Sequence, residues 1–477
     1  MLKKILLLIV LLTSSLFPQS NLKEVQYKID TVLSNKYFNS TLMGIDIYDL
    51  SARQSIYKKN ENMLLNPASN MKILTTSTAL VFLGPTYSFT TSLYYSGKII
   101  NKTLYGDLYV VGGSDPDFTT EDIDSLVSVI KSLGIKEITG NIYGDVSMMD
   151  SLFWGRGWMW DDDPSTDAPY LTPLDINRNS IGIIVKSKLL GEKPSVSLVP
   201  PTDYVSIQNK AITVPADSPN TLKVTRAWLN RKNKIIVEGD LPNKVIPDSL
   251  QDTLHVNVFR PDFYFLTLLK EHAVNSGIIF DGKIDTATTP FSAINFFNFK
   301  RPFDSVIVNL NKVSYNLGAE MTMYAFSRKF YGKPATAQNG MKVIDSLLVL
   351  AGLTPDNYRI VDGSGVSRYD LVTAKVLLSV LKYMYYKKPS LFRILYKSFP
   401  IAGVDGTLKN RMKNTPAEGN VHAKTGTLSG VCSLSGYLTA KNGHLIVFSM
   451  LTENFVGSAK IGRNFQDEIS NILVNYN

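Results

Sequence analysis

The chain has 477 residues, a formal net charge of +9 and a single cysteine. A single cysteine leaves no intramolecular disulfide, so stability must come from hydrophobic cores, and this length is sufficient for two or three of them. The charge is modest for the size, and no run of lysine and arginine reaches the density of a nucleic-acid surface. Nucleic acid is therefore not expected as a partner.

The N-terminus has the pattern of an export signal. Lys3 and Lys4 precede an apolar run over residues 5–12, and polar residues follow up to Ser20. The apolar core is too short to span a bilayer comfortably, and this order of segments predicts a signal peptide over residues 1–20. We therefore expect an exported protein of the periplasm or cell envelope. A cleaved signal is favoured over an N-terminal anchor, although no clear small-x-small cleavage site marks it.

The first predicted elements after the signal are a hairpin and a helix. Residues 40–49 and 54–58 alternate between apolar and polar positions, which predicts two paired strands. Asn66 and Pro67 then have the pattern of an N-cap and a first helical residue, and Gly84 follows the apolar continuation as a stop signal. We therefore expect one helix between these signals.

The start of this helix contains Ser69-Asn70-Met71-Lys72. Residues three apart share a helix face, so the Lys72 amine can approach the Ser69 hydroxyl, while the unpaired amides of the first turn point to where an oxyanion would form. A serine needs a base to act as a nucleophile. A neutral lysine can be that base if burial or a second cation lowers its pKa, and Lys424 is the candidate for that cation.

Two further short patterns follow in order, Ser314-Tyr315-Asn316 and Lys424-Thr425-Gly426. The Lys-Thr-Gly pattern occurs once, and it precedes a run over 427–440 that we expect to form a strand paired with 444–451. A glycine at the start of an edge strand lets a substrate backbone lie against it. The three patterns in this order predict a serine acyl-transfer site. Each alone is weak, since similar spacings recur at Ser55/Lys58, Ser128/Lys131, Ser379/Lys382 and Ser218/Asn220.

The stretch between Lys72 and Ser314 is far longer than a loop requires and includes a predicted helix over 122–133, so it must form at least one inserted domain. A closing helix is expected over 463–474. The predicted division is a signal peptide over 1–20, a domain in two parts over 21–90 and 301–477, and one or two inserted domains over 91–300, with a nested subdomain near 112–175.

The set of motifs resembles the penicilloyl serine transferases, and more closely the low-molecular-mass class C penicillin-binding proteins, of the penicillin-binding protein 4 type. The resemblance implies an α/β (α+β) fold with a serine β-lactamase/transpeptidase-like antiparallel sheet flanked by helices. It also implies D-alanyl-D-alanine carboxypeptidase/endopeptidase activity on peptidoglycan stem peptides and cross-links, with β-lactam antibiotics as covalent inhibitors. It spans nearly the whole mature chain and rests on further segments at 106–108, 111–116, 157–162, 361–368 and 402–408.

The resemblance implies a role for each matching residue. Ser69 would attack the carbonyl of the penultimate D-alanine, and Lys72 would take its proton. Ser314 would relay a proton to the departing amine, and Asn316 would hold the substrate amide. In the third motif, Lys424 and Thr425 would bind the terminal carboxylate, and Gly426 would lie against the substrate backbone. The backbone amides of Thr427 and Ser69 would bind the oxyanion.

Three other residues are candidates for binding the side chain of the third stem-peptide residue. Trp160 and Asp162 lie in a segment of tryptophans and acids that could receive an amine, and the alternative is ordinary aromatic packing beside a solvated acidic turn. Arg368 could bind a carboxylate bidentately, and the alternative is a structural ion pair.

The sequence lacks the residue patterns that other hydrolytic mechanisms require. No cofactor or metal is expected, because the four histidines show no metal-ligand spacing, and His422 is expected to pack in its strand. The sequence has no Gly-x-Ser-x-Gly elbow of an α/β-hydrolase. The nearest rival enzyme is a β-lactamase-like hydrolase, yet no glutamate that could serve in deacylation occurs from Met321 to Ala417. A catalytically inactive wall-binding protein is the non-enzymatic alternative.

Overall fold

The chain forms two compact units in the computed structural model, which describes residues 17–244 and 252–477. Unit 1 comprises the residues up to Pro85, Ile307–Tyr315 and Met341–Asn477, and unit 2 comprises Thr86–Val306 and Asn316–Gly340. Every element below lies within the described ranges. The predicted signal peptide lies outside them, except for residues 17–20, which begin helix α2.

Unit 1 is built on an antiparallel sheet of five strands in the order β2-β1-β22-β21-β20. The predicted hairpin is confirmed, since β1 and β2 pair directly. β21 is buried along all but its last residue because it lies inside the sheet, whereas β20 lies at the edge. The strands are β1 (Leu42–Asp49), β2 (Gln54–Lys59), β20 (His422–Leu428), β21 (Val431–Thr439) and β22 (Leu445–Glu453).

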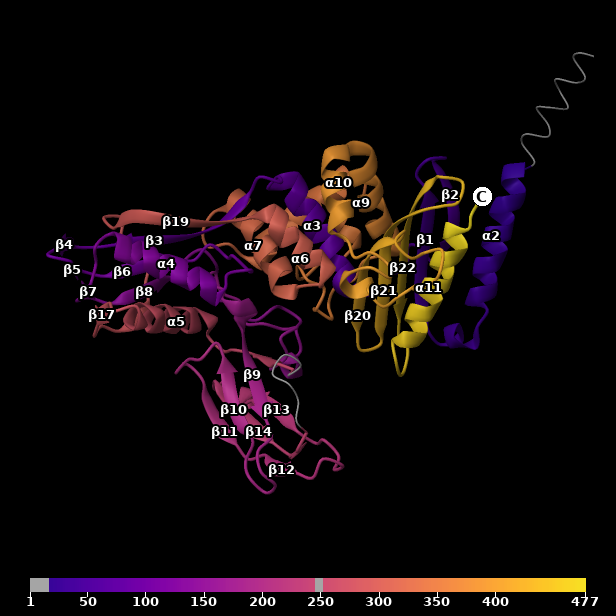
Figure 1. Ribbon diagram of the computed structural model, residues 1–477. Helices are drawn as coiled ribbons and strands as arrows, with labels where there is room; N and C mark the ends of the chain where they lie inside the picture. Colours follow the sequence, from indigo (N-terminus) through magenta and orange to yellow (C-terminus); the bar gives the residue numbers. More distant parts are fainter. Residues whose placement is uncertain (1–16, 245–251) are drawn as a thin grey trace, which may run out of the picture. The chain divides into compact units, whose positions relative to one another are not determined.

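Helices cover both faces of this sheet (Figure 1). α2 (Phe17–Leu33) and α11 (Lys460–Val474) pack on one face, where Ile29, Ile47, Leu434 and Leu473 belong to one apolar core. This arrangement confirms the predicted fold class, and α11 confirms the closing helix. The other face carries α3 (Met71–Phe82), α9 (Ala374–Lys387) and α10 (Pro389–Ser398). The remaining helices of this part are α6 (Phe303–Lys312), α8 (Ala337–Leu350) and the 3-10 turns η1 (Lys36–Asn39), η2 (Ala68–Asn70), η7 (Pro355–Asn357) and η8 (Gly406–Leu408).

The single strand predicted over 427–440 is wrong. The chain reverses at Gly430, whose φ is +72°, so this run is divided between the end of β20 and the whole of β21. Lys424 and Gly426 consequently lie within β20 and not ahead of a strand. Only the Ser429-Gly430 pair marks the turn in a run of otherwise small and apolar residues, which is why the periodicity did not show it.

Unit 2 contains a second five-stranded sheet, ordered β18-β8-β6-β3-β19, and a four-stranded sheet, ordered β17-β7-β5-β4. α4 (Thr120–Ser132) confirms the predicted helix; its start is closed by the Asp122 carboxylate, which accepts a hydrogen bond from the Thr119 amide. α5 (Pro261–Asn275) packs beside α4, and α7 (Asn316–Tyr331) completes the unit. The strands are β3 (Ser88–Tyr95), β4 (Lys98–Ile100), β5 (Thr103–Tyr105), β6 (Leu108–Val111), β7 (Glu137–Ile138), β8 (Ile142–Asp145), β17 (Ile279–Phe280), β18 (Ile284–Thr286) and β19 (Ile294–Pro302).

Smaller sheets occupy residues 180–257 of unit 2, in the orders β10-β9-β16, β11-β14-β13 and β12-β15. This region lies after the range near 112–175 in which the sequence suggested a nested subdomain, and the domain limits stay a prediction. The elements are β9 (Ser180–Lys186), β10 (Ser195–Val199), β11 (Ser206–Asn209), β12 (Ile212–Val214), β13 (Lys223–Arg226), β14 (Lys234–Glu238), β15 (Asp240–Pro242) and β16 (Leu254–Asn257), with the 3-10 turns η3 (Trp160–Asp162), η4 (Asn177–Asn179) and η5 (Trp228–Asn230).

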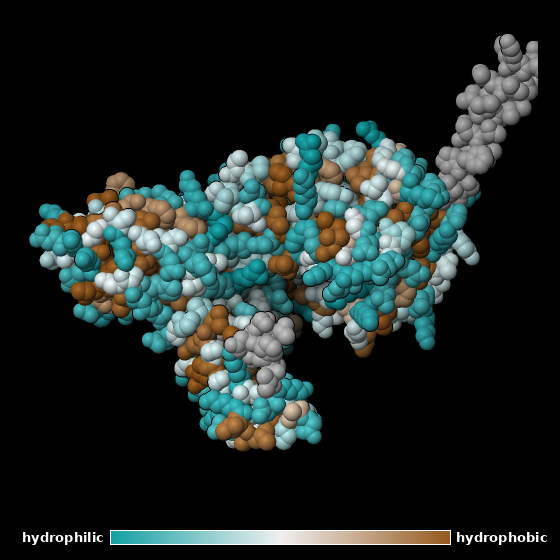
Figure 2. Space-filling view, viewed as in Figure 1, coloured by the Kyte–Doolittle hydropathy of each residue, from teal (hydrophilic) through white to brown (hydrophobic). Residues whose placement is uncertain are grey.

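The surface mixes polar and apolar side chains. Figure 2 shows brown apolar residues scattered among teal polar ones over the visible faces of both units. Scattered exposed apolar residues are ordinary on protein surfaces. Within residues 17–244 and 252–477, no helix has the length and apolar character needed to cross a membrane.

Candidate active site

Ser69 lies in the 3-10 turn η2, directly before helix α3. The sequence predicted a place in the first turn of the helix itself, and the α-helix begins two residues later, at Met71. The predicted N-cap at Asn66 is wrong by one residue, since Pro67 is the N-cap of this turn. Asn66 Oδ1 still accepts a hydrogen bond from the Ala68 amide at 2.8 Å. Ala68 adopts a left-handed φ of +45°. The sharp entry into η2 leaves Ser69 partly exposed between buried neighbours.

Lys72 is fully buried and forms the first lysine–serine pair of the site. Its Nζ lies 2.8 Å from Ser69 Oγ, as the spacing in the sequence predicted. Nζ also donates to the backbone carbonyl of Ser364 at 2.7 Å. These two contacts hold the amine of Lys72 beside the hydroxyl of the candidate nucleophile.

The Ser364 carbonyl belongs to a turn within 361–368, one of the segments on which the family resemblance rests. The Asp362 carboxylate accepts hydrogen bonds from the amides of Gly365 and Ser367, both at 2.7 Å. Gly365 has a φ of +82°, and a Cβ there would lie 1.9 Å from the Ala68 carbonyl oxygen, so only glycine fits. The Asp-Gly-Ser-Gly order is a turn signal, and this could have identified a tight loop but not its contact with Lys72.

Lys424 forms a second lysine–serine pair. It is fully buried on β20, and its Nζ donates to Ser314 Oγ and to the Thr425 carbonyl, each at 2.8 Å. Ser314 has a left-handed φ of +61°, which is uncommon outside glycine. Burial lowers the pKa of Lys424 well below its ordinary value, and the positive charge of Lys72 lowers this pKa further. The charge of Lys72 thus acts on Lys424, whereas the predicted lowering of the Lys72 pKa by Lys424 stays a prediction.

A buried network fastens the Ser69 turn to the edge strand β20. Asn70 Nδ2 donates to the Lys424 carbonyl at 3.0 Å and to Ser433 Oγ at 2.8 Å. Ser433 Oγ in turn donates to the Pro67 carbonyl at 2.7 Å. A Cβ added to Gly426 would lie 2.1 Å from Ser433 Oγ and 2.9 Å from the Ser69 amide nitrogen. The third motif is thus in close contact with the nucleophile turn.

The remaining residues of the third motif face the surface. Thr425 is partly exposed, and its Oγ1 donates to Thr407 Oγ1 at 2.7 Å. Thr427 is exposed, and its Oγ1 accepts a hydrogen bond from the guanidinium of Arg463 at 3.1 Å. Thr407 and Arg463 were not predicted as neighbours of this motif, because they come from η8 and α11, far away in the sequence.

Asn316 belongs to unit 2, where it begins α7. It is buried, and its Nδ2 donates to the Asp167 carbonyl at 2.6 Å. Asp162 Oδ2 accepts from the Met159 amide at 2.7 Å, while Asp163 forms a buried ion pair with Arg226. The neighbouring acids Asp162 and Asp163 therefore have different roles, one in a local turn and one in a buried ion pair.

The other two candidate side-chain contacts lie in different surroundings. Trp160 in unit 2 is 69% exposed. Arg368 in unit 1 donates from Nη1 to the Ser429 carbonyl at 3.0 Å. His422 packs as expected, since its ring stacks on Tyr396 at a centroid distance of 4.1 Å, and burial lowers its pKa. Among the described residues, no group of three or more metal-ligating side chains is found.

The chain matches the model of a known enzyme family over most of its length. The D-Ala-D-Ala carboxypeptidase 3 (S13) family matches residues 25–476. The chain belongs to this family. Membership confirms the predicted enzyme class, a serine-type D-alanyl-D-alanine carboxypeptidase with the fold of a penicillin-binding protein.

Relatives from two bacteria match over most of their length. The chain is 29% identical over 472 residues to the D-alanyl-D-alanine carboxypeptidase of Actinomadura sp. (strain R39), covering 96% of this chain and 86% of that protein. It is 30% identical over 430 residues to the D-alanyl-D-alanine carboxypeptidase DacB of Haemophilus influenzae, covering 87% of this chain and 86% of that protein.

Solved structures of penicillin-binding protein 4 (DacB) from Haemophilus influenzae share the fold. One has a TM-score of 0.83 at 27% identity and covers 94% of this chain and 99% of that chain. Another, complexed with a novel β-lactam, has a TM-score of 0.76 at 26% identity and covers 93% and 98%.

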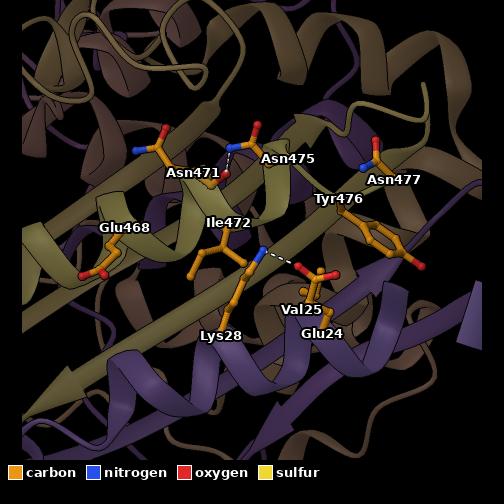
Figure 3. Close-up of a pocket in the computed structure, with 9 residues that line it drawn as sticks. All are labelled: Glu24, Val25, Lys28, Glu468, Asn471, Ile472, Asn475, Tyr476 and Asn477. Carbon is orange, nitrogen blue, oxygen red and sulfur yellow. Dashed lines mark hydrogen bonds and ion pairs between the residues drawn. The ribbon is translucent and has the colours of Figure 1, made fainter. Parts of the chain in front are cut away.

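A separate hollow in unit 1 contains none of the predicted site residues. It lies between α2 and α11 and has a volume of about 280 Å³ (Figure 3). Within it Lys28 Nζ pairs with Glu24 Oε1 at 2.6 Å, and Asn475 donates to the Asn471 carbonyl at 2.8 Å. Both contacts join residues four apart in the chain, and the lining contains no serine, threonine or cysteine.

Proposed function

We propose that Ser69 is the nucleophile and that it forms an acyl-enzyme with the penultimate D-alanine of peptidoglycan stem peptides. The observation that carries this proposal is the 2.8 Å contact between Ser69 Oγ and the buried amine of Lys72. Neutral Lys72 takes the hydroxyl proton as the serine oxygen bonds to the carbonyl carbon. The C–N bond to the terminal D-alanine then breaks, and water later hydrolyses the ester.

Proton delivery to the departing amine is assigned to the second pair. Ser314 Oγ lies 2.8 Å from Lys424 Nζ, so the hydroxyl can pass a proton to the amine and be resupplied by the lysine. The lowered pKa of Lys424 supports this role, because an ammonium that loses its proton readily is a better donor. We propose Asn316 as the residue that holds the substrate amide.

Substrate binding is assigned to the edge strand β20. Thr425, Gly426 and Thr427 would lie along the substrate backbone, and Lys424 with Thr425 would attract its terminal carboxylate. The oxyanion would be held by the amides of Ser69 and Thr427. The close approach of Gly426 to the Ser69 amide supports this arrangement, since it keeps the two donor segments in contact.

The same acyl-enzyme serves carboxypeptidase and endopeptidase reactions, because they differ in the group that leaves. We propose both trimming of stem peptides and cleavage of cross-links, and covalent inhibition by β-lactams. The solved relative from Haemophilus influenzae complexed with a β-lactam supports the last point. For the third stem-peptide residue, Trp160 and Asp162 remain the proposed contacts for an amine, and Arg368 for a carboxylate. To test the Arg368 contact, kcat/KM of Arg368→Ala and of wild type is measured on substrates with and without that carboxylate. If Arg368→Ala loses kcat/KM equally on both substrates, the contact is excluded.

The organisation of the chain and its location complete the proposal. We propose a transpeptidase-like domain formed by 21–90 and 301–477 and interrupted by 91–300. Most residues of this proposed domain belong to unit 1, which supports the proposal. We also propose export to the periplasm or cell envelope with the signal peptide 1–20. Fractionation of cells expressing the full chain, with N-terminal sequencing of the product, tests both the location and the cleavage.

The decisive experiment is covalent labelling by a fluorescent penicillin, combined with mass spectrometry of peptidoglycan fragments. Ser69→Ala should abolish both the adduct and the release of D-alanine. Ser55→Ala is the matched control, because Ser55 has the same Ser-x-x-Lys spacing but lies on β2. A stable adduct in the Ser69 variant would refute the assignment, and rapid release of hydrolysed penicillin by wild type would favour a β-lactamase-like hydrolase.

A further inference from the structure

All four tryptophans of the chain line a single pocket of unit 2. The pocket has a volume of about 390 Å³, within the range of about 300–1,000 Å³ common for small-molecule sites. The tryptophans come from two segments that are distant in the sequence, and the wall also contains a cation and further apolar side chains: Trp154, Trp158, Trp160, Trp228, Phe153, Tyr170, Leu229 and Arg231. Such a concentration of large aromatic rings indicates a built site.

Two tryptophans form the inner wall and two form the open rim. Trp158 is buried and meets Trp154 edge to face at 5.4 Å, and it packs so closely over Gly155 that a Cβ there would lie 2.2 Å from the ring. Trp160 is 69% exposed, and its ring lies 5.2 Å from that of Trp228 at an interplanar angle of 32°. The rim therefore offers two neighbouring aromatic rings to solvent.

A buried polar network supports the inner wall. Asp163 accepts a hydrogen bond from Tyr170 Oη at 2.8 Å and pairs with the fully buried Arg226. Arg226 Nε donates to Asn257 Oδ1 at 3.3 Å, and Asn257 donates onward to the Ala168 carbonyl at 2.9 Å. The acid that lines the pocket is thus already neutralised, and the wall is held by contacts that extend beyond it.

The charge of the pocket then comes from Arg231, whose guanidinium lies 5.5 Å from the centre of the Phe153 ring. A cationic ligand would be repelled by Arg231 and would find Asp163 already paired. The ligand that fits is neutral or anionic, with a flat apolar face for the tryptophans and a polar edge for the arginine. A pyranose ring has such a face, formed by its axial C–H groups, and the carbonyl of an N-acetyl group can accept a hydrogen bond from a guanidinium.

We infer that this pocket binds an N-acetylated sugar ring of the glycan strand to which the stem peptides are attached. The inference rests on the proposed function, which supplies peptidoglycan as the substrate, and extends it from the peptide to the sugar. Binding energy obtained from the sugar is remote from the scissile bond and can position the peptide for reaction. Trp160 is also a proposed contact for the side-chain amine, which would have to lie outside the pocket beside Asp162 because Arg231 repels a cation inside it. Trp228 is therefore the residue whose variant tests the sugar site alone.

Intrinsic tryptophan fluorescence tests this inference directly, because every tryptophan of the chain lies at the pocket. The full-length protein is titrated with the tetramer of N-acetylglucosamine, and maltotetraose, which lacks N-acetyl groups, serves as the control sugar. We expect a saturable change in emission with the first sugar alone. Trp228→Ala should weaken binding by about fivefold or more, as expected for loss of one aromatic contact, and Trp228→Phe by less.

Phe291→Ala is the matched protein control, since Phe291 is a fully exposed ring of unit 2 outside the pocket. It should bind the sugar as wild type does. Equal affinities for wild type and a folded Trp228→Ala, or no saturable change in wild type, would overturn the inference. Displacement of the sugar by a sugar-free D-alanyl-D-alanine peptide would also overturn it, because the pocket would then take peptide. Penicillin labelling of Trp228→Ala should persist, so failure of the proposed function is recognised separately by loss of labelling in wild type.

Discussion

Gly426→Ala should slow acylation strongly, because the turn that holds Ser69 leaves no room for a single added methyl group. The Cβ of Gly426→Ala would lie 2.1 Å from Ser433 Oγ, 2.8 Å from the Pro67 carbonyl oxygen and 2.9 Å from the Ser69 amide nitrogen. The last two atoms belong to the backbone of the turn that carries the nucleophile. They must move for the methyl group to fit, so the substitution displaces Ser69 itself.

Both stability and rate follow from these contacts. Ser433 Oγ donates to the Pro67 carbonyl and accepts from Asn70, and the methyl group would break both buried hydrogen bonds. Overpacking costs about 1–3 kcal/mol and each of the two lost hydrogen bonds about 1 kcal/mol, so the free energy of unfolding should fall by about 3–5 kcal/mol. A displacement of about 1 Å at a reacting group lowers a rate by about 100-fold. Acylation by fluorescent penicillin should therefore slow by about that factor.

The control separates backbone strain from displacement of the nucleophile. Gly443 has a φ of +80°, and an added Cβ would meet nothing within 4 Å, so Gly443→Ala should cost about 1 kcal/mol of strain and leave acylation unchanged. Combining Gly426→Ala with Ser433→Gly removes the nearest clash but leaves both backbone contacts. Stability should then recover in part relative to Ser433→Gly alone, while acylation stays slow. An acylation rate of Gly426→Ala within about tenfold of wild type would refute the reasoning.

Three further changes test one buried lysine and two buried acids. Lys72→Arg keeps a charge but cannot lose a proton at working pH, so the acylation rate should fall by about 100-fold or more with the fold retained; a rate near that of wild type would make Lys72 structural. Asp362→Ala removes the acceptor that shapes the turn before Ser364, so the same assay should show a loss of about tenfold or more, and an unchanged rate would exclude a positioning role. Burial raises the pKa of Asp46 from 3.8 to about 6, partly opposed by Lys58, so the folded state favours the protonated carboxyl. The stabilising contribution of the protonated Asp46 is fully present below about pH 4 and is lost as the pH rises through about 6. Denaturant unfolding should show that the free energy of unfolding of wild type falls by at most about 3 kcal/mol over this interval, and Asp46→Asn should lack this fall. Equal pH dependence in both proteins would assign the change to another group.

Local patterns in the sequence predicted those parts of the site that depend on neighbours in the chain. The approach of Lys72 to Ser69 follows from a spacing of three residues, and it holds although a 3-10 turn takes the place of the first helical turn. The hydrogen bond from the Ala68 amide to Asn66 Oδ1 is equally local. Both are set by backbone geometry within a few residues, which is the range over which sequence signals are reliable.

Contacts between distant segments could not be predicted in the same way. The hydrogen bond from Lys424 to Ser314 joins residues 110 positions apart, and the one from Lys72 to the Ser364 carbonyl joins residues 292 apart. Their existence depends on strand order and on a turn at Gly430 that periodicity did not reveal. The acidic segment shows the same limit, since the sequence treats Asp162 and Asp163 alike, whereas the fold uses one to close a turn and buries the other against Arg226.

The two lysines have parallel surroundings, and this similarity is what the proposed movement of a proton in both directions requires. Each is fully buried, and the contacts of each include a serine hydroxyl and a backbone carbonyl. Two ammonium groups in such surroundings oppose each other, so the state with a single proton between them is favoured over the doubly charged state. In the proposed mechanism, Ser69 transfers its proton to Lys72, and the new charge would lower the proton affinity of Lys424 at the moment when Ser314 must give a proton to the departing amine. Electrostatic repulsion would then couple the proposed base of the first step to the proposed acid of the second.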